Sequence, residues 1–405
     1  MRLSKTYSIY LIPVFLCIFV LSLYAQEALT LKQVLNLAKE NNITMIKARK
    51  NIESAKARLI KAGKYSNPEI NADSYISPKG ENSYEFVVNQ EFDLLGKVGI
   101  RKSIAEDEVT IAGEEMNLAW SEVTLVIKEA YYEILLMEKR KDITQENLQL
   151  FRKLLDMAQL RYNSGEILLS EVTRAKIELS QAENEYYFAD KELRTSKAKF
   201  NFILNKPADF DFIPGDSIEY EEIKFDYSAL YQKALLNNPE IKARTMHAKI
   251  NRKEFDLVKK DVFSNPAIGF GSKKETGETS TGASISIVLP FWYRNTGEIK
   301  EAAVEMEKLS QDIEYFKKQL EVDIFNACIE TEYIAKQVAN FKKNLEQSNY
   351  ILNQINLQYK EGKVELFAYL DNMKTVKNVR LGYYEAVLGY NKKIALIEKL
   401  LNAEL

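Results

Sequence analysis

The chain has 405 residues, enough for two or three ordinary globular cores, and its composition already excludes several classes of protein. Its 56 Lys and Arg nearly balance 58 Asp and Glu, so it lacks the positive field typical of a nucleic-acid-binding protein. The chain has only 15 Gly, 8 Pro, 2 Cys and 1 His, which excludes collagens, disulfide scaffolds and nearly all zinc or haem proteins. We therefore predict no cofactor, no metal site and no nucleic-acid partner.

The first 25 residues are predicted to be a secretory signal peptide. Arg2 and Lys5 precede an apolar run over residues 9–23, and the small residue Ala25 offers a cleavage point. A retained membrane anchor is the alternative. The run is shorter than the roughly 20 apolar residues that a spanning helix needs, however, and Pro13 interrupts it. We therefore expect an exported protein.

The remaining chain contains an internal duplication at a shift of about 197 residues. Short motifs recur in the same order in both halves. They are Asn41-Asn42 with Asn237-Asn238, Ser66-Asn67-Pro68 with Ser264-Asn265-Pro266, and Tyr162 and Gly165 with Tyr359 and Gly362. We therefore predict a first structural repeat over residues 26–204, a linker over 205–226 and a second repeat over 227–405.

Each repeat is predicted to begin with a short helix, over residues 30–64 and 228–263, followed by a β-hairpin. Proline disfavours the helical conformation of the residue before it, so the Asn-Pro pairs end these helices. Apolar and polar side chains then alternate, which predicts strands over about 67–93 and about 265–291. A soluble sheet that caps a helical domain is one interpretation. Strands of about 10 residues with one apolar face also fit a tilted barrel strand in a bilayer.

Two features favour the membrane interpretation of these strands. The aromatic residues Phe291, Trp292 and Tyr293 end the fourth strand, where an aromatic belt would meet the membrane interface. Four strands cannot close a membrane barrel, because the smallest examples have eight and an open edge would leave backbone groups unpaired in lipid. The chain must therefore share its barrel with identical copies, and the strand count permits two, three or more of them.

Heptad seams over residues 116–162 and 313–359 predict two very long helices. Extended back to Arg101, the first would run for about 63 residues, or about 95 Å. Second seams follow Gly165 and Gly362, which we expect to take positive φ where the chain reverses. The result is one antiparallel helical hairpin per repeat, over about 97–204 and about 294–403. Polar seam residues, Lys141 and Thr144 among them, indicate partly hydrated packing.

Several short motifs, taken in order along the chain, resemble those of the TolC family of outer membrane efflux proteins. They are Gln90-Glu91-Phe92-Asp93-Leu94-Leu95-Gly96-Lys97, Arg161-Tyr162-Asn163-Ser164-Gly165, Pro290-Phe291-Trp292-Tyr293-Arg294-Asn295-Thr296-Gly297 and Tyr359-Lys360-Glu361-Gly362. The resemblance covers nearly the whole mature chain. The turns at Gly96-Lys97 and 294–297 are similar to those of the heavy-metal cation branch, the CzcC-like proteins.

The resemblance implies a mainly α fold with a small membrane β-barrel part, made of long antiparallel coiled-coil helices and two β-hairpins per chain. It implies a homotrimer with a 12-stranded barrel in the outer membrane and a helical tunnel in the periplasm, with the linker over 205–226 in an equatorial belt. The implied partners are a periplasmic adaptor protein, an inner-membrane pump reached through the adaptor, and the lipid bilayer.

The resemblance also implies functional residues at the hairpin tips. Asp371 matches a carboxylate of the pore constriction, and Glu171 and Tyr359 match a gate link, although Val364 replaces the arginine of that link. An ordinary solvated helix face is the alternative for Asp371. Adaptor docking is expected beside four tip residues: Tyr162, Gly165, Tyr359 and Gly362. The two glycines have a simpler possible role, to form their turns.

The sequence contains no assembled catalytic set, so we predict that the protein is not an enzyme. His247 and Cys328 have no partners at ligand spacing and are interpreted as packing or surface residues. The leading hypothesis is a passive outer membrane exit duct of a tripartite exporter. The alternative is a secreted structural or adhesive coiled-coil protein without a channel.

Overall fold

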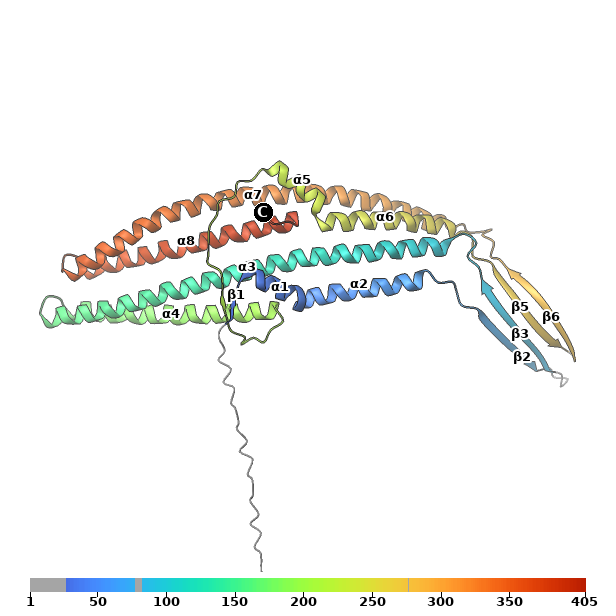
Figure 1. Ribbon diagram of the computed structural model, residues 1–405, viewed down its shortest axis with the longest axis horizontal. Helices are drawn as coiled ribbons and strands as arrows, with labels where there is room; N and C mark the ends of the chain where they lie inside the picture. The colour runs from blue at the N-terminus through green and yellow to red at the C-terminus, as the bar shows by residue number, and fades with distance from the viewer. Residues whose placement is uncertain (1–26, 77–81, 276) are drawn as a thin grey trace, which may run out of the picture.

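The computed structural model describes residues 27–76, 82–275 and 277–405, and the predicted signal peptide lies outside them. The protein is a long helical rod with a sheet at one end (Figure 1). Among the helices of the described ranges, none combines the length and the apolar character needed to cross a membrane.

The two halves contain the same elements in the same order. The first comprises α1 (Leu31–Asn41), α2 (Ile43–Ala62), β2 (Glu69–Ile76), β3 (Asn82–Glu91), α3 (Lys97–Asn163) and α4 (Leu169–Ile203). The second comprises α5 (Tyr227–Asn237), α6 (Pro239–Lys260), β5 (Ala267–Glu275), β6 (Glu278–Ser286), α7 (Thr296–Lys360) and α8 (Leu366–Leu401). The very long helices are confirmed: α3 has 67 residues and α7 has 65, so α3 spans about 100 Å.

Each predicted short helix is in fact two helices, divided at Asn42 and at Asn238. Both asparagines have extended backbones and accept hydrogen bonds from the first turn of the next helix, at the amide nitrogens of Thr44 and Glu240. Their side-chain amides also donate to the carbonyls of Ile203 and Leu400, at 2.7 and 3.1 Å. Each asparagine thus fastens its short helices to the end of the returning helix of its own repeat.

The four strands form one antiparallel sheet in the order β2-β3-β5-β6. In its register Ile70 pairs with Val88, Val88 with Phe270, and Phe270 with Ala283, so these side chains share one face. The two predicted hairpins are present. The last strand ends at Ser286, however, five residues before Phe291, so the aromatic run lies in the connection to α7 rather than at the end of a strand.

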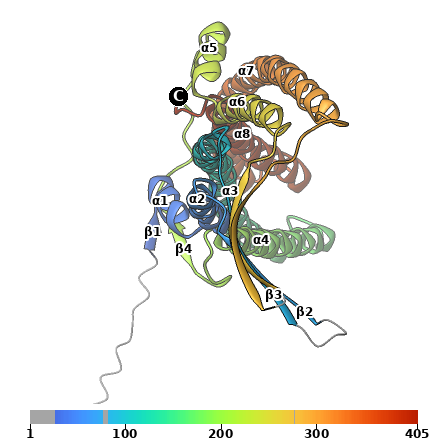
Figure 2. The ribbon, with the colours of Figure 1, turned by 90° about the vertical axis from the view of Figure 1, so that its right-hand side faces the viewer.

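Helix α3 is the centre of the rod, because it packs against α2 and α4 of its own repeat and against α6 and α8 of the other. Figure 2 looks along the rod from the sheet end and shows α2, α3 and α6 next to one another. Ion pairs join the two repeats along this line. Asp107 binds Lys249 at 3.0 Å and also binds Lys253, and Lys128 binds Glu398 at 2.6 Å.

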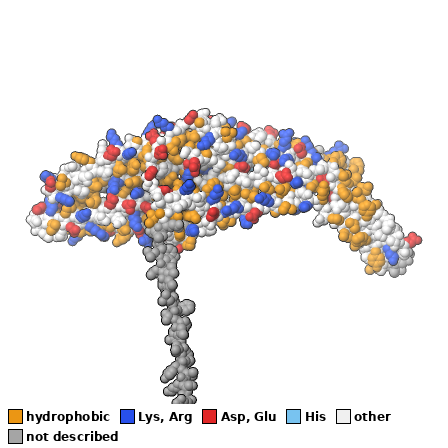
Figure 3. Space-filling view, viewed as in Figure 1, with side chains coloured by type: hydrophobic (Ala, Val, Ile, Leu, Met, Phe, Trp, Pro, Cys, Tyr) orange, Lys and Arg blue, Asp and Glu red, His pale blue; other side chains and the backbone are white. Residues whose placement is uncertain are grey.

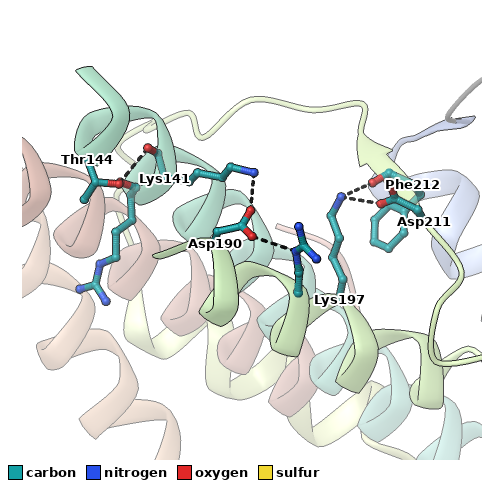
Figure 4. Close-up of polar contacts among 8 residues, drawn as sticks. Lys141, Thr144, Asp190, Lys197, Asp211 and Phe212 are labelled. Carbon is teal, nitrogen blue, oxygen red and sulfur yellow. Dashed lines mark hydrogen bonds and ion pairs between the residues drawn. The ribbon is translucent and has the colours of Figure 1, made fainter. Parts of the chain in front are cut away.

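The polar residues on the α3 seam have partners within the protein. Lys141 binds Asp190 of α4 at 2.6 Å, and Thr144 donates to the carbonyl of Arg140 (Figure 4). The hydrogen bond from Lys141 lowers the pKa of the Asp190 carboxyl, against the opposite effect of burial. At Lys141 the contact between α3 and α4 is therefore an ion pair rather than an apolar pair.

A short parallel pair of strands joins the start of the described chain to the linker. β1 (Glu27–Leu29) pairs with β4 (Phe212–Pro214), and Phe212 is fully buried. Lys197 of α4 anchors the same linker by binding Asp211 and the carbonyl of Phe212 (Figure 4).

Candidate channel elements

One face of the sheet is apolar and exposed. Ile70, Phe270 and Ile285 on this face are 63%, 65% and 71% exposed. Figure 3 shows hydrophobic side chains gathered over the sheet, whereas both signs of charge alternate along the helices. The edge strands β2 and β6 each pair with one neighbour only, so both long edges of the described sheet are open.

The opposite face is polar and carries most of the charge of the sheet. Antiparallel pairing places Asn71, Glu85 and Lys273 on this face, together with Gly269 and Gly271. A Cβ added at Gly271 would come within 2.7 Å of the carbonyl oxygen of Phe86, so the glycine permits a close approach of two strands. Its acidic side chains are Glu69, Asp73, Glu85, Glu91, Glu275 and Glu278.

The aromatic run after β6 is strongly exposed. Trp292 is 95% exposed and Phe291 is 71% exposed, and their rings form an edge-to-face pair. Tyr293 donates its hydroxyl proton to Glu298 at 2.7 Å and accepts from the backbone nitrogen of Gly297 at 3.1 Å. This last contact holds the start of α7 against the connection, so the run has a defined position between sheet and helix.

At the other end of the rod, both hairpin tips turn at a glycine with positive φ, as predicted. The φ angles are 76° at Gly165 and 69° at Gly362. A Cβ added at Gly165 would meet nothing within 4 Å, so its surroundings are open. Tyr162 beside it is 37% exposed. Tyr162 and Gly165 are therefore accessible at this end of the rod.

Arg161 joins the two tips, a role that the sequence did not reveal. Its guanidinium carbon lies 5.6 Å from the centroid of the Tyr359 ring, and its Nε binds Glu166 at 3.1 Å. The ring of Tyr359 is 1% exposed and packs 4.7 Å from that of Tyr369. Burial raises the pKa of Tyr369 to about 12. The aromatic pair therefore carries no charge at neutral pH, and Arg161 contacts it through its ring face.

The hydrogen bond expected between Glu171 and Tyr359 does not form within this chain. The hydroxyl of Tyr359 is buried without a hydrogen-bond partner among the described residues. Burial raises the pKa of this hydroxyl and the nearby Glu171 carboxylate raises it further, while Arg161 opposes both. A link between Glu171 and Tyr359 in the assembled protein stays a prediction, because the two groups lie close enough for the carboxylate to act on the hydroxyl.

Asp371 is exposed and lines a groove of about 410 Å³ between the two coiled coils. Lys374 and Lys377 of α8 and Glu185 of α4 line the same groove, and Lys377 binds Glu185 at 2.8 Å. The structure therefore brings Asp371 close to the tip of the first repeat and to basic side chains. It lies apart from Tyr162 and Gly165, which are at the turn itself.

Two buried tyrosines hold the linker over residues 205–226 against the rod. Tyr131 of α3 donates to the carbonyl of Leu29 at 2.8 Å and lies 2.9 Å from a carboxylate oxygen of Asp216. Tyr390 of α8 accepts from the backbone nitrogen of Ile223 at 2.8 Å. The linker is thus fixed to both repeats, and Asn391 of α8 adds a second bond by donating to the carbonyl of Glu219 at 3.1 Å. The duplication gave no signal for these contacts, because neither tyrosine has a counterpart in the other half.

Within the described ranges, no three His, Cys, Asp or Glu side chains are grouped so that they could hold a metal ion. Cys328 is buried, and burial raises the pKa of its thiol. His247 is exposed on α6.

Comparisons with known proteins agree on the family of the chain. The family model described as outer membrane efflux protein matches residues 34–206. The cobalt-zinc-cadmium resistance protein CzcC of Cupriavidus metallidurans is 21% identical over 386 residues, which cover 92% of this chain and 89% of that protein.

Solved structures show the same fold. The structure of CusC superposes with a TM-score of 0.78 at 13% identity and covers 93% of this chain and 92% of its own. The CmeC outer membrane channel of Campylobacter jejuni gives a TM-score of 0.77 at 14% identity, with 92% and 85% covered. The open-state MtrE outer membrane channel of Neisseria gonorrhoeae gives 0.75 at 17% identity, with 92% and 89% covered. Sequence motifs, family model, relative and fold thus agree: residues 34–206 match the family of outer membrane efflux proteins, and the chain has the fold of outer membrane channels over more than nine-tenths of its length.

Proposed function

We propose that the protein is the outer membrane exit duct of a tripartite exporter, a passive conduit and not an enzyme. The observation that carries this proposal is the open sheet at the end of the rod, with one apolar face and two unpaired edges. Such a sheet is unstable alone in water. It cannot lie in the hydrocarbon of a bilayer either unless the backbone groups of its edges are paired. It becomes stable when copies of the chain join edge to edge into a closed barrel.

Three copies supply twelve strands, the number that the family resemblance implies. In this arrangement β6 of one chain pairs with β2 of the next, a head-to-tail contact that closes a ring. The apolar face then contacts the hydrocarbon of the outer membrane, and the polar face lines the lumen. The helical part extends into the periplasm.

Exposed apolar side chains along the rod support the same assembly. On α7 they include Tyr315, Phe325 and Tyr333, and on α4 they include Tyr187 and Phe202, which is 82% exposed. Large apolar side chains in such numbers indicate surfaces that are covered in the assembled protein. We propose that they pack between neighbouring chains, so that three rods form one tunnel.

The tips are proposed to contact a periplasmic adaptor and to form the gate. Open surface at Tyr162, Gly165 and Gly362 suits docking by adaptor helices, and the adaptor connects the duct to an inner-membrane pump that supplies the energy. For the gate we propose that Arg161 holds the second coil through the ring of Tyr359. Glu171 then acts only by its charge. Asp371 is proposed to line the constriction, where three copies would favour cations.

Metal cations are the proposed cargo. The relative CzcC is described as a cobalt, zinc and cadmium resistance protein. The lumenal face of the sheet carries six carboxylates and, in Lys273, one cation. A lumen of this charge attracts cations and repels anions.

Crosslinking in detergent and conductance in planar bilayers test the proposal. The mature chain should crosslink up to a trimer and no further, and the purified trimer should insert and conduct with cation preference. The same crosslinking reaction on protein unfolded in urea is the control for random collisions, and it should give no trimer band. Recovery of a monomer from the periplasm without detergent would instead support the secreted coiled-coil alternative.

A further inference from the structure

The end of the rod nearest the sheet carries a group of exposed cations that the duct function does not use. They lie in the last turns of α2 and α6, the first two turns of α3 and α7, and the connections to the sheet. We call this group the basic collar: Lys61, Lys64, Arg101, Lys102, Lys259, Lys260, Arg294 and Lys300, all of which are exposed.

Half of the basic collar, namely the side chains of Lys61, Lys64, Arg294 and Lys300, has no ion pair, hydrogen bond or ring contact among the described residues. Lys259 lies 4.0 Å from the centroid of the Phe255 ring, and Arg101, against the effect of burial, helps to lower the pKa of the Asp93 carboxyl. Lys102 reaches Glu106 at 3.9 Å, and Lys260 donates to the carbonyl of Leu95 at 2.7 Å. The other six form no ion pair with any described carboxylate. Lys102 lies across the end of α2, where a Cβ added at Gly63 would be 3.5 Å from its Cδ, so the cations of α2 and α3 form one surface.

The carboxylates at the same level of the rod are mostly engaged. Asp93 accepts from the first backbone nitrogens of α3, and Asp261 binds the buried Lys97 at 2.8 Å. Glu298 accepts from Tyr293, and Glu91 accepts from Ser66 at 3.0 Å. The exposed Glu301 on α7 is an exception. The cations of the basic collar therefore outnumber the carboxylates that remain free to meet them.

The helix dipole accounts for only part of this pattern. Lys61, Lys259 and Lys260 stand at helix C-termini, where cations are favoured. Arg294 stands just before the N-terminus of α7, where the dipole disfavours a cation. Its counterpart at the duplication shift, Lys97, is buried and paired with Asp261, whereas Arg294 is exposed without an ion pair. An anion from outside the chain would offset this cost.

The position of the basic collar indicates which anion that is. It borders the apolar face of the sheet, and exposed aromatic residues accompany it: Tyr65 at 66%, Phe263 at 54% and Trp292 at 95%. In a bilayer, aromatic residues mark the interface and the headgroup phosphates lie just outside the hydrocarbon. Lysine and arginine bury their carbon chains along apolar surface and extend their charges to that level.

We propose that the basic collar binds the phosphates of anionic phospholipids in the leaflet that faces the helical part. The inference rests on the proposed function, because it requires the sheet to lie in a membrane. Bound lipid would fix the depth of the barrel in the bilayer and neutralise the cations of the basic collar that have no ion pair among the described residues.

Tryptophan fluorescence provides a reporter inside the basic collar. The chain has two tryptophans, and Trp120 lies against the helical core far from the sheet. In a Trp120→Phe background, emission comes from Trp292 alone. The full protein is reconstituted into phosphatidylcholine vesicles that contain a fraction of phosphatidylglycerol, with bromine on the chains of one lipid or the other. Bromine quenches tryptophan on contact, so the two series compare the two lipids around Trp292.

Two matched variants remove four exposed cations each. The collar variant carries Lys64→Gln, Lys259→Gln, Arg294→Gln and Lys300→Gln. The control variant carries Lys153→Gln, Lys318→Gln, Lys342→Gln and Lys343→Gln, which are exposed, form no ion pair with a described carboxylate and lie farther along the rod. Crosslinking first establishes that each variant assembles as the parent does.

The parent and the control should favour phosphatidylglycerol over phosphatidylcholine by about fivefold, the preference expected from about one basic residue per headgroup. In the collar variant the ratio should fall to about one. Equal quenching by both lipids in the parent, or a preference that survives in the collar variant, would overturn the proposal that the basic collar binds anionic lipid. Either result would still be compatible with a sheet that lies in the membrane. Absence of quenching by either lipid would reject the proposed function itself, and with it the lipid contact.

Discussion

The guanidinium of Arg161 covers the ring of Tyr359 at 5.6 Å and so connects the tip of the first helical hairpin to that of the second. The tyrosine is buried and its hydroxyl makes no hydrogen bond of good geometry in the described chain, although Arg161 lies near enough to oppose the rise in its pKa that burial causes, so the connection rests mainly on the ring face. Arg161→Gln and Tyr359→Phe test the ring face and the hydroxyl of Tyr359 separately.

Arg161→Gln should loosen the second coil. A cation over an aromatic ring contributes roughly 0.5–1 kcal/mol at a partly exposed site, and a trimer would lose three such contacts. We expect higher conductance in planar bilayers and more frequent openings. Arg152→Gln is the control, since Arg152 reaches only Glu183 at 3.8 Å and touches no aromatic ring of the second tip. Equal conductance in both variants would remove Arg161 from the gate.

Tyr359→Phe should leave conductance unchanged and should alter stability by less than about 0.5 kcal/mol. The reason is that the substitution deletes a buried hydroxyl that makes no hydrogen bond, while the ring beneath Arg161 stays. Single-channel recording checks the conductance, and thermal unfolding checks the stability. A channel opened by this substitution would show instead that Tyr359 bonds to Glu171 in the assembled protein.

Asp371→Lys should shift the reversal potential in a salt gradient toward anions. In the trimer the substitution replaces three negative charges by three positive ones at the proposed constriction. Asp323→Lys, at an exposed position in the middle of α7, is the matched charge reversal and should have a smaller effect. A shift of the same size in both would mean that Asp371 lies outside the narrow part.

Acid should weaken the junction of the two repeats at Asp107. Burial alone would raise the pKa of this carboxyl, but hydrogen bonds from Lys253 and Lys249 outweigh it and lower the pKa below 3.8. Because the folded state has the lower pKa, the contribution to stability is complete above 3.8 and is lost as the pH falls through the folded value. Asp107→Asn should cost about 1–2 kcal/mol at neutral pH, since Lys249 is half exposed and water can solvate it. Unfolding midpoints between pH 7 and pH 2 should converge for parent and variant at the acid end.

Tyr390→Phe should loosen the linker locally at Ile223, while Asn391 still donates to the carbonyl of Glu219. The backbone nitrogen of Ile223 would lose its acceptor, at a cost of about 1 kcal/mol. Hydrogen exchange followed by mass spectrometry should show faster exchange in the peptide around Ile223 and no change around Asp216, which Tyr131 holds. Tyr384→Phe, at a tyrosine in the same helix whose hydroxyl makes no hydrogen bond with the described residues, should leave both peptides as they are.

Periodicity along the sequence was sufficient for the repeating parts of this fold. The heptad seams predicted α3 and α7 nearly to their ends, and the alternation around Phe86 and Phe270 predicted both hairpins. These patterns are readable because each face of a helix or strand meets one environment over many residues. The positive φ at Gly165 and Gly362 followed for a similar reason, since a tight reversal favours a residue without Cβ.

Contacts between distant single residues could not be read in the same way. The duplication marked Asn42 and Asn238 as a pair, but only the fold shows that their amides reach Ile203 and Leu400, about 160 residues away. Arg161 was visible as part of a motif, yet its contact with Tyr359 depends on how the two coils lie against each other. Such contacts arise from packing between elements, which leaves no periodic trace in the sequence.

The pairing of β1 with β4 has a consequence for biogenesis. Leu29 lies opposite Pro214, and the backbone nitrogen of Leu31 is held by Asp216 at 2.6 Å, so the first described residues are secured by a segment synthesised some 185 residues later. The leading end of the described chain therefore stays unpaired until the whole first hairpin and the linker have been made. Completion of the first half can then coincide with arrival of the linker, which makes this small strand pair a natural checkpoint between the folding of one repeat and the emergence of the next.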